Sequence, residues 1–157
     1  MVKSNKDQNI EFIVDKNKWL KDDVKIAKKA ANLIVLKEQY ACIKLSDDKE
    51  IRVLNYKWRS IDKPTNVLSF PNNKKINDKK VYLGDIILAF ETINNESIRQ
   101  NIPRINHLAH LVLHGLLHLK GFHHYNNIDA RKMESLEINY LASLGISNPY
   151  ECEKNEE

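Results

Sequence analysis

The sequence contains only two cysteines in 157 residues, Cys42 and Cys152, and they are far apart. They form no C-x-x-C pair, so the sequence excludes both a disulfide-stapled scaffold and a zinc ribbon. Cys42 lies in an apolar run, and we expect it to be a small buried core residue. Because nothing in the cysteine pattern requires an oxidising compartment, we expect a cytoplasmic location.

The sequence also lacks long hydrophobic segments. No stretch approaches the roughly 18 uncharged apolar residues of a transmembrane helix, and residues 1–11 contain no apolar core of a signal peptide. We therefore expect no association with a membrane. Hydrophobic residues make up 42% of the chain, which is ordinary for a globular protein. Because there is no internal repeat or low-complexity linker, we predict one domain over residues 1–157, with loose polar tails at 1–8 and 152–157.

Positive charge is only in slight excess. The net charge is +4 at pH 7 and the sequence pI is about 8.9. Such an excess is compatible with a polyanionic partner such as RNA. A composition rich in Lys, Asn and Ile, of the kind that A/T-rich codon usage produces, explains the charge equally well, so both interpretations stay open.

Apolar periodicity and turn residues predict strands that alternate with helices. The expected strands cover residues 10–14, 40–45, 67–70 and 81–89, and residues 72–80 form a charged hairpin loop. The expected helices cover residues 18–37, 47–58, 91–100, 103–119 and 128–144. The helix over 103–119 is apolar nearly all round, so it should lie buried in the domain centre. This pattern predicts an α+β fold with a mixed sheet of four or five strands packed with helices.

Histidine is confined to one short segment: all six histidines lie between His107 and His124. Of these, His114, His118 and His124 have the spacing of a three-histidine metal site. His114 and His118 project from the same face of the predicted helix, one turn apart. Gly121 can adopt a backbone conformation that other residues avoid, which lets the chain fold back and bring His124 toward the pair. Three histidines with an open fourth position are typical of catalytic rather than structural zinc.

Each histidine alone is better explained as a hydrogen-bonded core residue or a surface residue, but the whole set favours a metal site. Imidazole suits zinc, copper, nickel and iron. We predict one zinc ion per chain, whose bound water would have a pKa of about 7. His107 and His110 precede the first ligand on the helix, and we interpret them as groups that line the cleft or support the ligands. His123 could replace His124 as a ligand, although the spacing favours His124.

The same spacing occurs in metzincin proteases, whose motif is H-E-x-x-H-x-x-G-x-x-H. The glutamate of that motif is the general base, and Gly115 stands at its position in this chain. Met133 lies inside a predicted helix rather than in a turn beneath the site. A protease is therefore disfavoured.

Three segments together resemble the YbeY endoribonucleases of bacteria and organelles. Residues 114–124, HGLLHLKGFHH, resemble the family string H-G-x-L-H-L-x-G-Y/F-D-H. Residues 62–71, DKPTNVLSFP, and residues 83–86, LGDI, match two further family segments. The HLAH sequence before the metal motif and the C-terminal end are also similar. The resemblance covers most of residues 50–150 in the family's order.

The resemblance implies a small α+β fold and a zinc-dependent endoribonuclease specific for single-stranded RNA. It implies roles in ribosomal RNA maturation, at the 3′ end of the 16S RNA of the small ribosomal subunit, and in ribosome quality control. By position, His114, His118 and His124 would be metal ligands and catalytic residues, and Arg59 would be the catalytic arginine of the cleft. Arg59 would hold the scissile phosphate with Lys63, because a planar guanidinium binds two phosphate oxygens and stays charged. RNA and the small subunit are the implied partners, and no DNA partner is expected.

One position departs from the family: His123 stands where the family usually has aspartate. The identity of the general acid and base therefore stays open. Two other functions also stay open, namely a non-enzymatic, zinc-containing ribosome assembly or RNA-binding factor, and a metal-dependent hydrolase of small phosphoesters. The cleavage site, the protein partners, the oligomeric state and the metal bound in vivo do not follow from the sequence.

Overall fold

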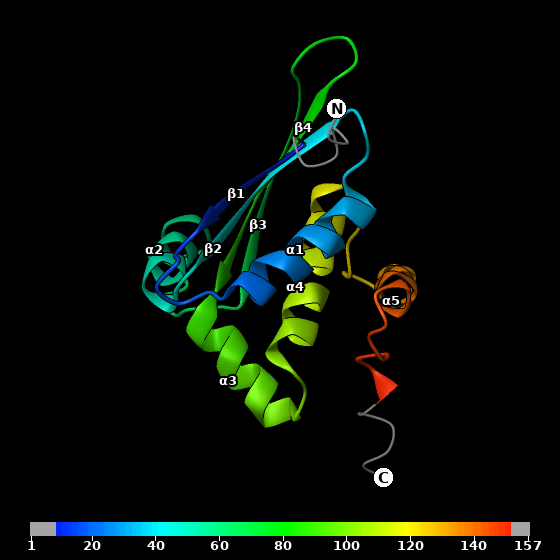
Figure 1. Cartoon of the computed structure of the whole chain (residues 1–157). Helices are drawn as coiled ribbons and strands as arrows, with labels where there is room; N and C mark the ends of the chain where they lie inside the picture. The colour runs from blue at the N-terminus through cyan, green and yellow to red at the C-terminus, as the bar shows by residue number, and fades with distance from the viewer. Residues whose placement is uncertain (1–8, 152–157) are drawn as a thin grey trace, which may run out of the picture.

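Four strands and five helices make up the part of the chain that the structure describes, residues 9–151 (Figure 1). The structure is a computed structural model, and the two predicted tails, with Cys152, lie outside the described residues. The elements in chain order are β1 (Ile10–Val14), α1 (Lys21–Ile34), β2 (Gln39–Ser46), α2 (Asp48–Arg59), β3 (Val67–Lys75), β4 (Val81–Ala89), α3 (Phe90–Gln100), α4 (Arg104–Leu119) and α5 (Asn127–Ser143). Each coincides with an element expected from the sequence, although several ends differ.

The four strands form one mixed sheet in the order β1-β2-β4-β3. β1 pairs parallel with β2, and β2 pairs parallel with β4. β3 pairs antiparallel with β4 and forms one edge of the sheet. The predicted α+β fold with a mixed sheet is therefore confirmed.

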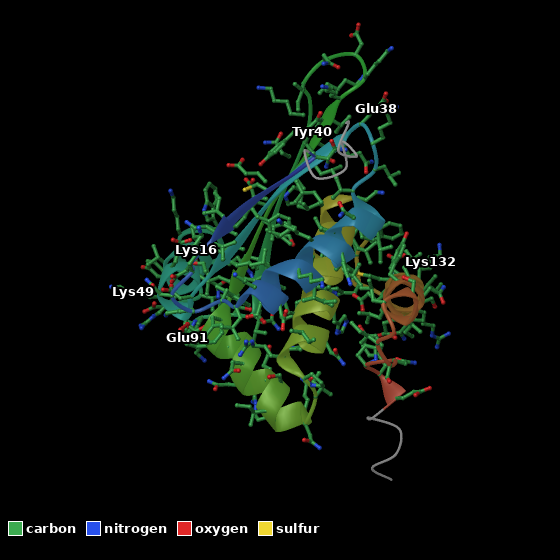
Figure 2. The ribbon with its side chains drawn as sticks, in the orientation of Figure 1. Lys16, Glu38, Tyr40, Lys49, Glu91 and Lys132 are labelled. Atoms are coloured by element: carbon green, nitrogen blue, oxygen red, sulfur yellow. The ribbon has the colours of Figure 1, made fainter. Side chains whose placement is uncertain are left out.

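The two faces of the sheet carry different helices. Along β4, Ile86 and Leu88 belong to the larger core beneath α1 and α4, while Ile87 and Ala89 belong to a smaller core with Ile51 of α2. This alternation follows from the two-residue period of a strand. α2 therefore lies on one face of the sheet, α1 and α4 lie on the other, and α5 packs against α4 (Figure 1). Figure 2 shows Lys49 of α2 and Lys132 of α5 at opposite sides of the molecule.

The helix that carries most of the histidines, α4, is buried as predicted. It begins after Pro103, whose missing N–H is not needed at a helix start. Ten of its 16 residues are buried. At its first residue, Arg104 donates two hydrogen bonds, of 3.0 and 3.1 Å, to the fully buried carboxylate of Asp23 in α1. This ion pair fixes the start of α4 against α1.

Two elements have bounds that differ from the sequence-based expectation. β3 continues past Phe70 to Lys75, because its charged residues keep pairing with β4 in an exposed hairpin. α1 is shorter than residues 18–37 and covers Lys21–Ile34. Its start is fixed by Asp23, whose carboxylate accepts a hydrogen bond of 2.8 Å from the backbone N–H that precedes the helix.

The expectations for Cys42 and for membrane spans have different outcomes. Cys42 is only half-buried, so the prediction of a buried core residue is wrong. Its neighbours Ala41 and Ile43 take the core side of β2, and strand alternation turns Cys42 to the other face. Among the described helices, none is both long and apolar enough to cross a membrane.

Candidate metal centre

His114, His118 and His124 come together in the structure, as their spacing predicts. The first two lie one turn apart on α4, and the third follows the turn after that helix. One ring nitrogen from each histidine lies within 4.8 Å of the other two. The rings of His114 and His118 are the closest pair, with centroids 4.5 Å apart. These three residues are called the histidine cluster below.

The turn at Gly121 brings the third histidine back toward α4. Gly121 has a φ of +93°, a backbone conformation that residues with a side chain rarely adopt. Its N–H donates a hydrogen bond of 3.0 Å to the carbonyl of His118, and the N–H of Phe122 donates one of 3.1 Å to the carbonyl of Leu117. These two bonds close the end of α4 and turn the chain toward His124, which is the role predicted for this glycine.

The hydrogen bonds of the two helical histidines determine which ring nitrogen is free to bind a metal. The Nδ1 atom of His114 lies 2.6 Å from Oε1 of Glu137, and the Nδ1 atom of His118 lies 2.9 Å from the backbone carbonyl of Phe122. Carboxylate and carbonyl oxygens only accept hydrogen bonds, so both Nδ1 atoms must carry the hydrogen and donate. In neutral imidazoles, each Nε2 atom therefore presents a lone pair.

The two Nε2 atoms of His114 and His118 face each other at 3.0 Å. Two lone pairs at this distance repel unless a cation or a proton lies between them. In a tetrahedral site with metal–nitrogen distances of ~2.0–2.1 Å, ligand nitrogens lie about 3.3 Å apart. Burial, together with the neighbouring His114, lowers the pKa of His118 and favours the neutral imidazole that metals bind. The donor set therefore fits a divalent metal such as zinc.

Glu137 supports the cluster from α5 and is a residue that the sequence-based prediction missed. Its carboxylate is almost completely buried, and both oxygens are used. Oε1 accepts from His114, while Oε2 accepts from Nε2 of His110 at 2.9 Å and from the hydroxyl of Tyr150. Burial acts to raise the pKa of Glu137, but the hydrogen bonds from His110 and His114 outweigh it and hold the pKa at about 2.

A sequence signal for Glu137 does exist. The buried residues of α5 are Met133, Glu137 and Leu141, which are spaced four residues apart and so form one stripe along the helix. A charged residue in the middle of an apolar stripe is costly unless it has partners. Such a residue is therefore a candidate for a functional role.

The remaining three histidines have distinct positions. His107 is buried at 5% exposure and bonds the Glu96 carboxylate at 3.1 Å, so it does not line a cleft. His110 is part of the Glu137 network and thus supports a ligand. His123 is exposed and stacks on the Tyr125 ring, with centroids 4.9 Å apart. His124, not His123, is therefore the third member of the cluster.

Arg59 and Lys63 lie outside the histidine cluster. Both are exposed: Arg59 is the last residue of α2, on the opposite face of the sheet from α4, and Lys63 lies in the loop after that helix. The buried Asn55 holds both of them: its Oδ1 accepts a hydrogen bond of 3.3 Å from Arg59, and its Nδ2 donates one of 2.8 Å to the carbonyl of Lys63. The structure thus places the two candidate phosphate-binding residues together, but across β3 from the histidines.

Known proteins resemble this chain over most of its length. A family model described as Endoribonuclease YbeY matches residues 3–145. The chain belongs to the YbeY family. The Endoribonuclease YbeY of Bradyrhizobium diazoefficiens is 48% identical over 118 residues, which are 72% of this chain and 64% of that relative. The Endoribonuclease YbeY of Ehrlichia canis is 47% identical over 108 residues, which are 69% of each chain.

A solved structure also shares the fold of this YbeY chain. The solution structure of a Thermotoga maritima protein matches with a TM-score of 0.58 and 21% identity, over 94% of this chain and 93% of that one. The match shows a common fold. Within this fold, residues 62–71 lead into β3 and residues 114–124 end α4, so the two longest segments of the YbeY resemblance meet where α4 packs on β3.

Proposed function

We propose that the chain is a metal-dependent endoribonuclease that cleaves single-stranded RNA, with one zinc ion held by His114, His118 and His124. The observation that carries the proposal is the pair of Nε2 atoms 3.0 Å apart, each left with its lone pair because its Nδ1 hydrogen is bonded to an oxygen. Three histidine ligands leave a fourth position for water or substrate, as in catalytic zinc sites. A divalent metal there would act as a Lewis acid and lower the pKa of a bound water to about 7.

RNA is the substrate that the family membership supports. The curated relatives carry the name endoribonuclease, and the excess of four positive charges suits a polyanion. From the family resemblance we further propose a cytoplasmic role in 16S ribosomal RNA maturation at the 3′ end, in association with the small subunit, and in ribosome quality control.

Arg59 and Lys63 are proposed to bind the RNA backbone next to the bond that is cut. The edge strand β3 contacts both helices: Ser69 on β3 bonds α4, and the next residue, Phe70, packs its ring on Trp58 of α2. RNA that crosses the edge of β3 would thus contact Arg59 on one side and the histidine cluster on the other. A guanidinium suits this role because it binds two phosphate oxygens at once.

A comparison of His118→Ala with His123→Ala tests the proposal. Both variants remove an imidazole from the same segment, but only His118 belongs to the cluster. We expect mass spectrometry to find one zinc per chain in the unaltered protein and in His123→Ala, and none in His118→Ala. Cleavage of single-stranded ribosomal RNA should follow the zinc content and stop when a chelator is added. Full RNA cleavage by metal-free protein would contradict the proposal.

The same preparations separate the two alternatives. A non-enzymatic assembly factor with structural zinc would retain the metal and bind RNA, but would leave the RNA intact. A hydrolase of small phosphoesters would cleave a model phosphodiester faster than it cleaves single-stranded RNA. We expect RNA to be the better substrate, because only a substrate long enough to cross β3 can contact Arg59, Lys63 and the histidine cluster at once.

A further inference from the structure

Glu137 has a position that core packing does not explain. The residue lies in the buried stripe of α5 between Met133 and Leu141, and its side chain is 1% exposed. A buried carboxylate costs several kcal/mol unless it is well paired, and an apolar side chain of similar volume often gives an equal or more stable fold. Stability alone is therefore a weak explanation for a carboxylate at this position.

We propose that Glu137 is a positioning residue of the metal centre, which holds the His114 ring with Nε2 directed at the metal. The inference rests on the metal centre proposed above. The oxygen that would hold the ring is Oε1 of Glu137, which lies 2.6 Å from Nδ1 of His114. As long as that oxygen accepts the Nδ1 hydrogen, His114 cannot adopt the other tautomer and cannot turn its ring.

The second oxygen of Glu137 is fixed just as firmly as the first. Oε2 accepts hydrogen bonds from Nε2 of His110 and from the hydroxyl of Tyr150. These donors come from α4 and from the segment after α5, so they hold the carboxylate from two directions. A rigid carboxylate behind a ligating histidine restricts the ring and makes its other nitrogen a better donor to the metal.

The two helical ligands differ in how they are held. His118 donates to a backbone carbonyl, that of Phe122, which is neutral and which any side chain at position 122 would supply. His114 donates to a charged side chain, which a substitution can remove. The metal affinity of the cluster should therefore depend strongly on the residue at position 137.

Asp23 provides a matched control for Glu137. Its carboxylate is fully buried and accepts hydrogen bonds from Arg104, at the opposite end of α4 from the cluster. Asp23→Ala and Glu137→Ala both remove a buried carboxylate that accepts hydrogen bonds from side chains on α4. Both variants should lower the melting temperature, but only Glu137→Ala should change metal binding.

The experiment measures the affinity of the full chain for Zn²⁺ by competition with a chromophoric chelator, and records the visible absorption of the Co²⁺ form. We expect Glu137→Ala to bind Zn²⁺ about 10- to 100-fold more weakly than the unaltered chain and to change the Co²⁺ spectrum. Glu137→Gln keeps an oxygen for His114 but loses the charge, so it should recover part of the affinity. Asp23→Ala should bind Zn²⁺ as the unaltered chain does.

The possible outcomes are distinguishable. If the unaltered chain binds Zn²⁺ and Glu137→Ala binds it equally well with the same Co²⁺ spectrum, the positioning role is overturned while the metal centre stands. If the unaltered chain and His118→Ala both fail to bind Zn²⁺, the proposed metal centre itself is wrong. Should Glu137→Ala not fold, Glu137→Gln decides: an affinity equal to that of the unaltered chain overturns the role of the charge in positioning, and a weaker one supports it.

Discussion

The hydroxyl of Ser69 donates a hydrogen bond of 3.1 Å to the backbone carbonyl of Gly115, the residue that follows His114. This bond joins the edge strand β3 to α4 between the two helical ligands. Gly115 packs directly on the sheet, because a Cβ atom there would lie 3.2 Å from the side chains of Ile86 and Ser69 and 3.3 Å from that of Val67. The missing side chain of Gly115 thus sets how closely α4 approaches β3.

Gly115→Ala should therefore destabilise the fold. Overpacking of a core typically costs about 1–3 kcal/mol, of which the higher helix propensity of alanine over glycine offsets ~1 kcal/mol. The net loss is then up to about 2 kcal/mol, and we expect the melting temperature to fall by up to roughly 8 °C. Ile105→Ala, on the exposed side of the same helix, should lower it less. A higher melting temperature for Gly115→Ala would show that α4 can move away from β3 without loss.

The packing at position 115 also bears on the protease alternative. Metzincins carry their general base at this position. A glutamate here would point at the side chains of β3 and β4, because position 115 faces the sheet. Gly115 has no side chain that could act as this base, so the structure agrees with the sequence in disfavouring a protease.

The local part of the candidate site follows from the sequence. Two histidines four residues apart share a helix face by the geometry of the helix alone. The fold-back at Gly121 follows from the freedom of glycine to adopt a positive φ, which the structure shows. The burial of α4 and the presence of the strands likewise follow from apolar periodicity, since the hydrophobic effect acts on every sequence in the same way.

The contacts between distant segments could not be predicted in this way. Glu137 meets His114 and Tyr150 only because α5 packs on α4 at one particular angle and rotation, which periodicity does not fix. The placement of Arg59 on the far face of the sheet depends on the crossover from β2 through α2 to the edge strand. The prediction that Cys42 lies in the core is wrong because hydropathy does not show which face of β2 each residue takes.

Removal of the metal should lower the stability of the chain. A ligand that binds only the folded state stabilises it, by about 2.7 kcal/mol when its free concentration is 100 times its dissociation constant. For a domain of this size that corresponds to a rise in melting temperature of roughly 5–10 °C. We expect Zn²⁺ to produce this rise in the chelated and dialysed protein, as measured by thermal denaturation followed by circular dichroism. His118→Ala should show no such rise, and an equal rise in that variant would place the ion elsewhere.

Arg59→Ala should separate RNA cleavage from metal binding. Arg59 is exposed and lies on the opposite face of the sheet from the histidines, so its removal should leave the zinc content unchanged. If its guanidinium holds the phosphate during cleavage, kcat/KM for single-stranded RNA should fall by about 10- to 100-fold, equivalent to a lost charge-assisted hydrogen bond of about 1.5–3 kcal/mol. Steady-state kinetics on a labelled oligonucleotide would measure the change.

Arg99 is the matched control for Arg59, because it is also an exposed arginine in the last turn of a helix, in this case α3. Arg99→Ala should cleave RNA at nearly the rate of the unaltered chain. Lys63→Ala should have a smaller effect than Arg59→Ala, since an ammonium cannot bind two phosphate oxygens in a fixed geometry. Equal rates for Arg59→Ala and Arg99→Ala would remove Arg59 from the proposed active site.

Gly121→Ala should weaken the metal centre through the backbone alone. A Cβ atom at Gly121 would meet nothing within 4 Å, so the substitution causes no clash. Its φ of +93° nevertheless strains a residue with a side chain, by about 1–2 kcal/mol. The turn can relieve this strain only by moving, and it then carries His124 away from the two ligands on α4.

Gly145→Ala provides the control, because Gly145 has a φ of +75°, also has open space for a Cβ atom, and follows the end of α5. Both variants should lose a similar amount of thermal stability, whereas only Gly121→Ala should bind Zn²⁺ more weakly, by about tenfold if the strain falls fully on the bound state. Equal Zn²⁺ affinities in the two variants would mean that His124 does not depend on this turn to reach the metal.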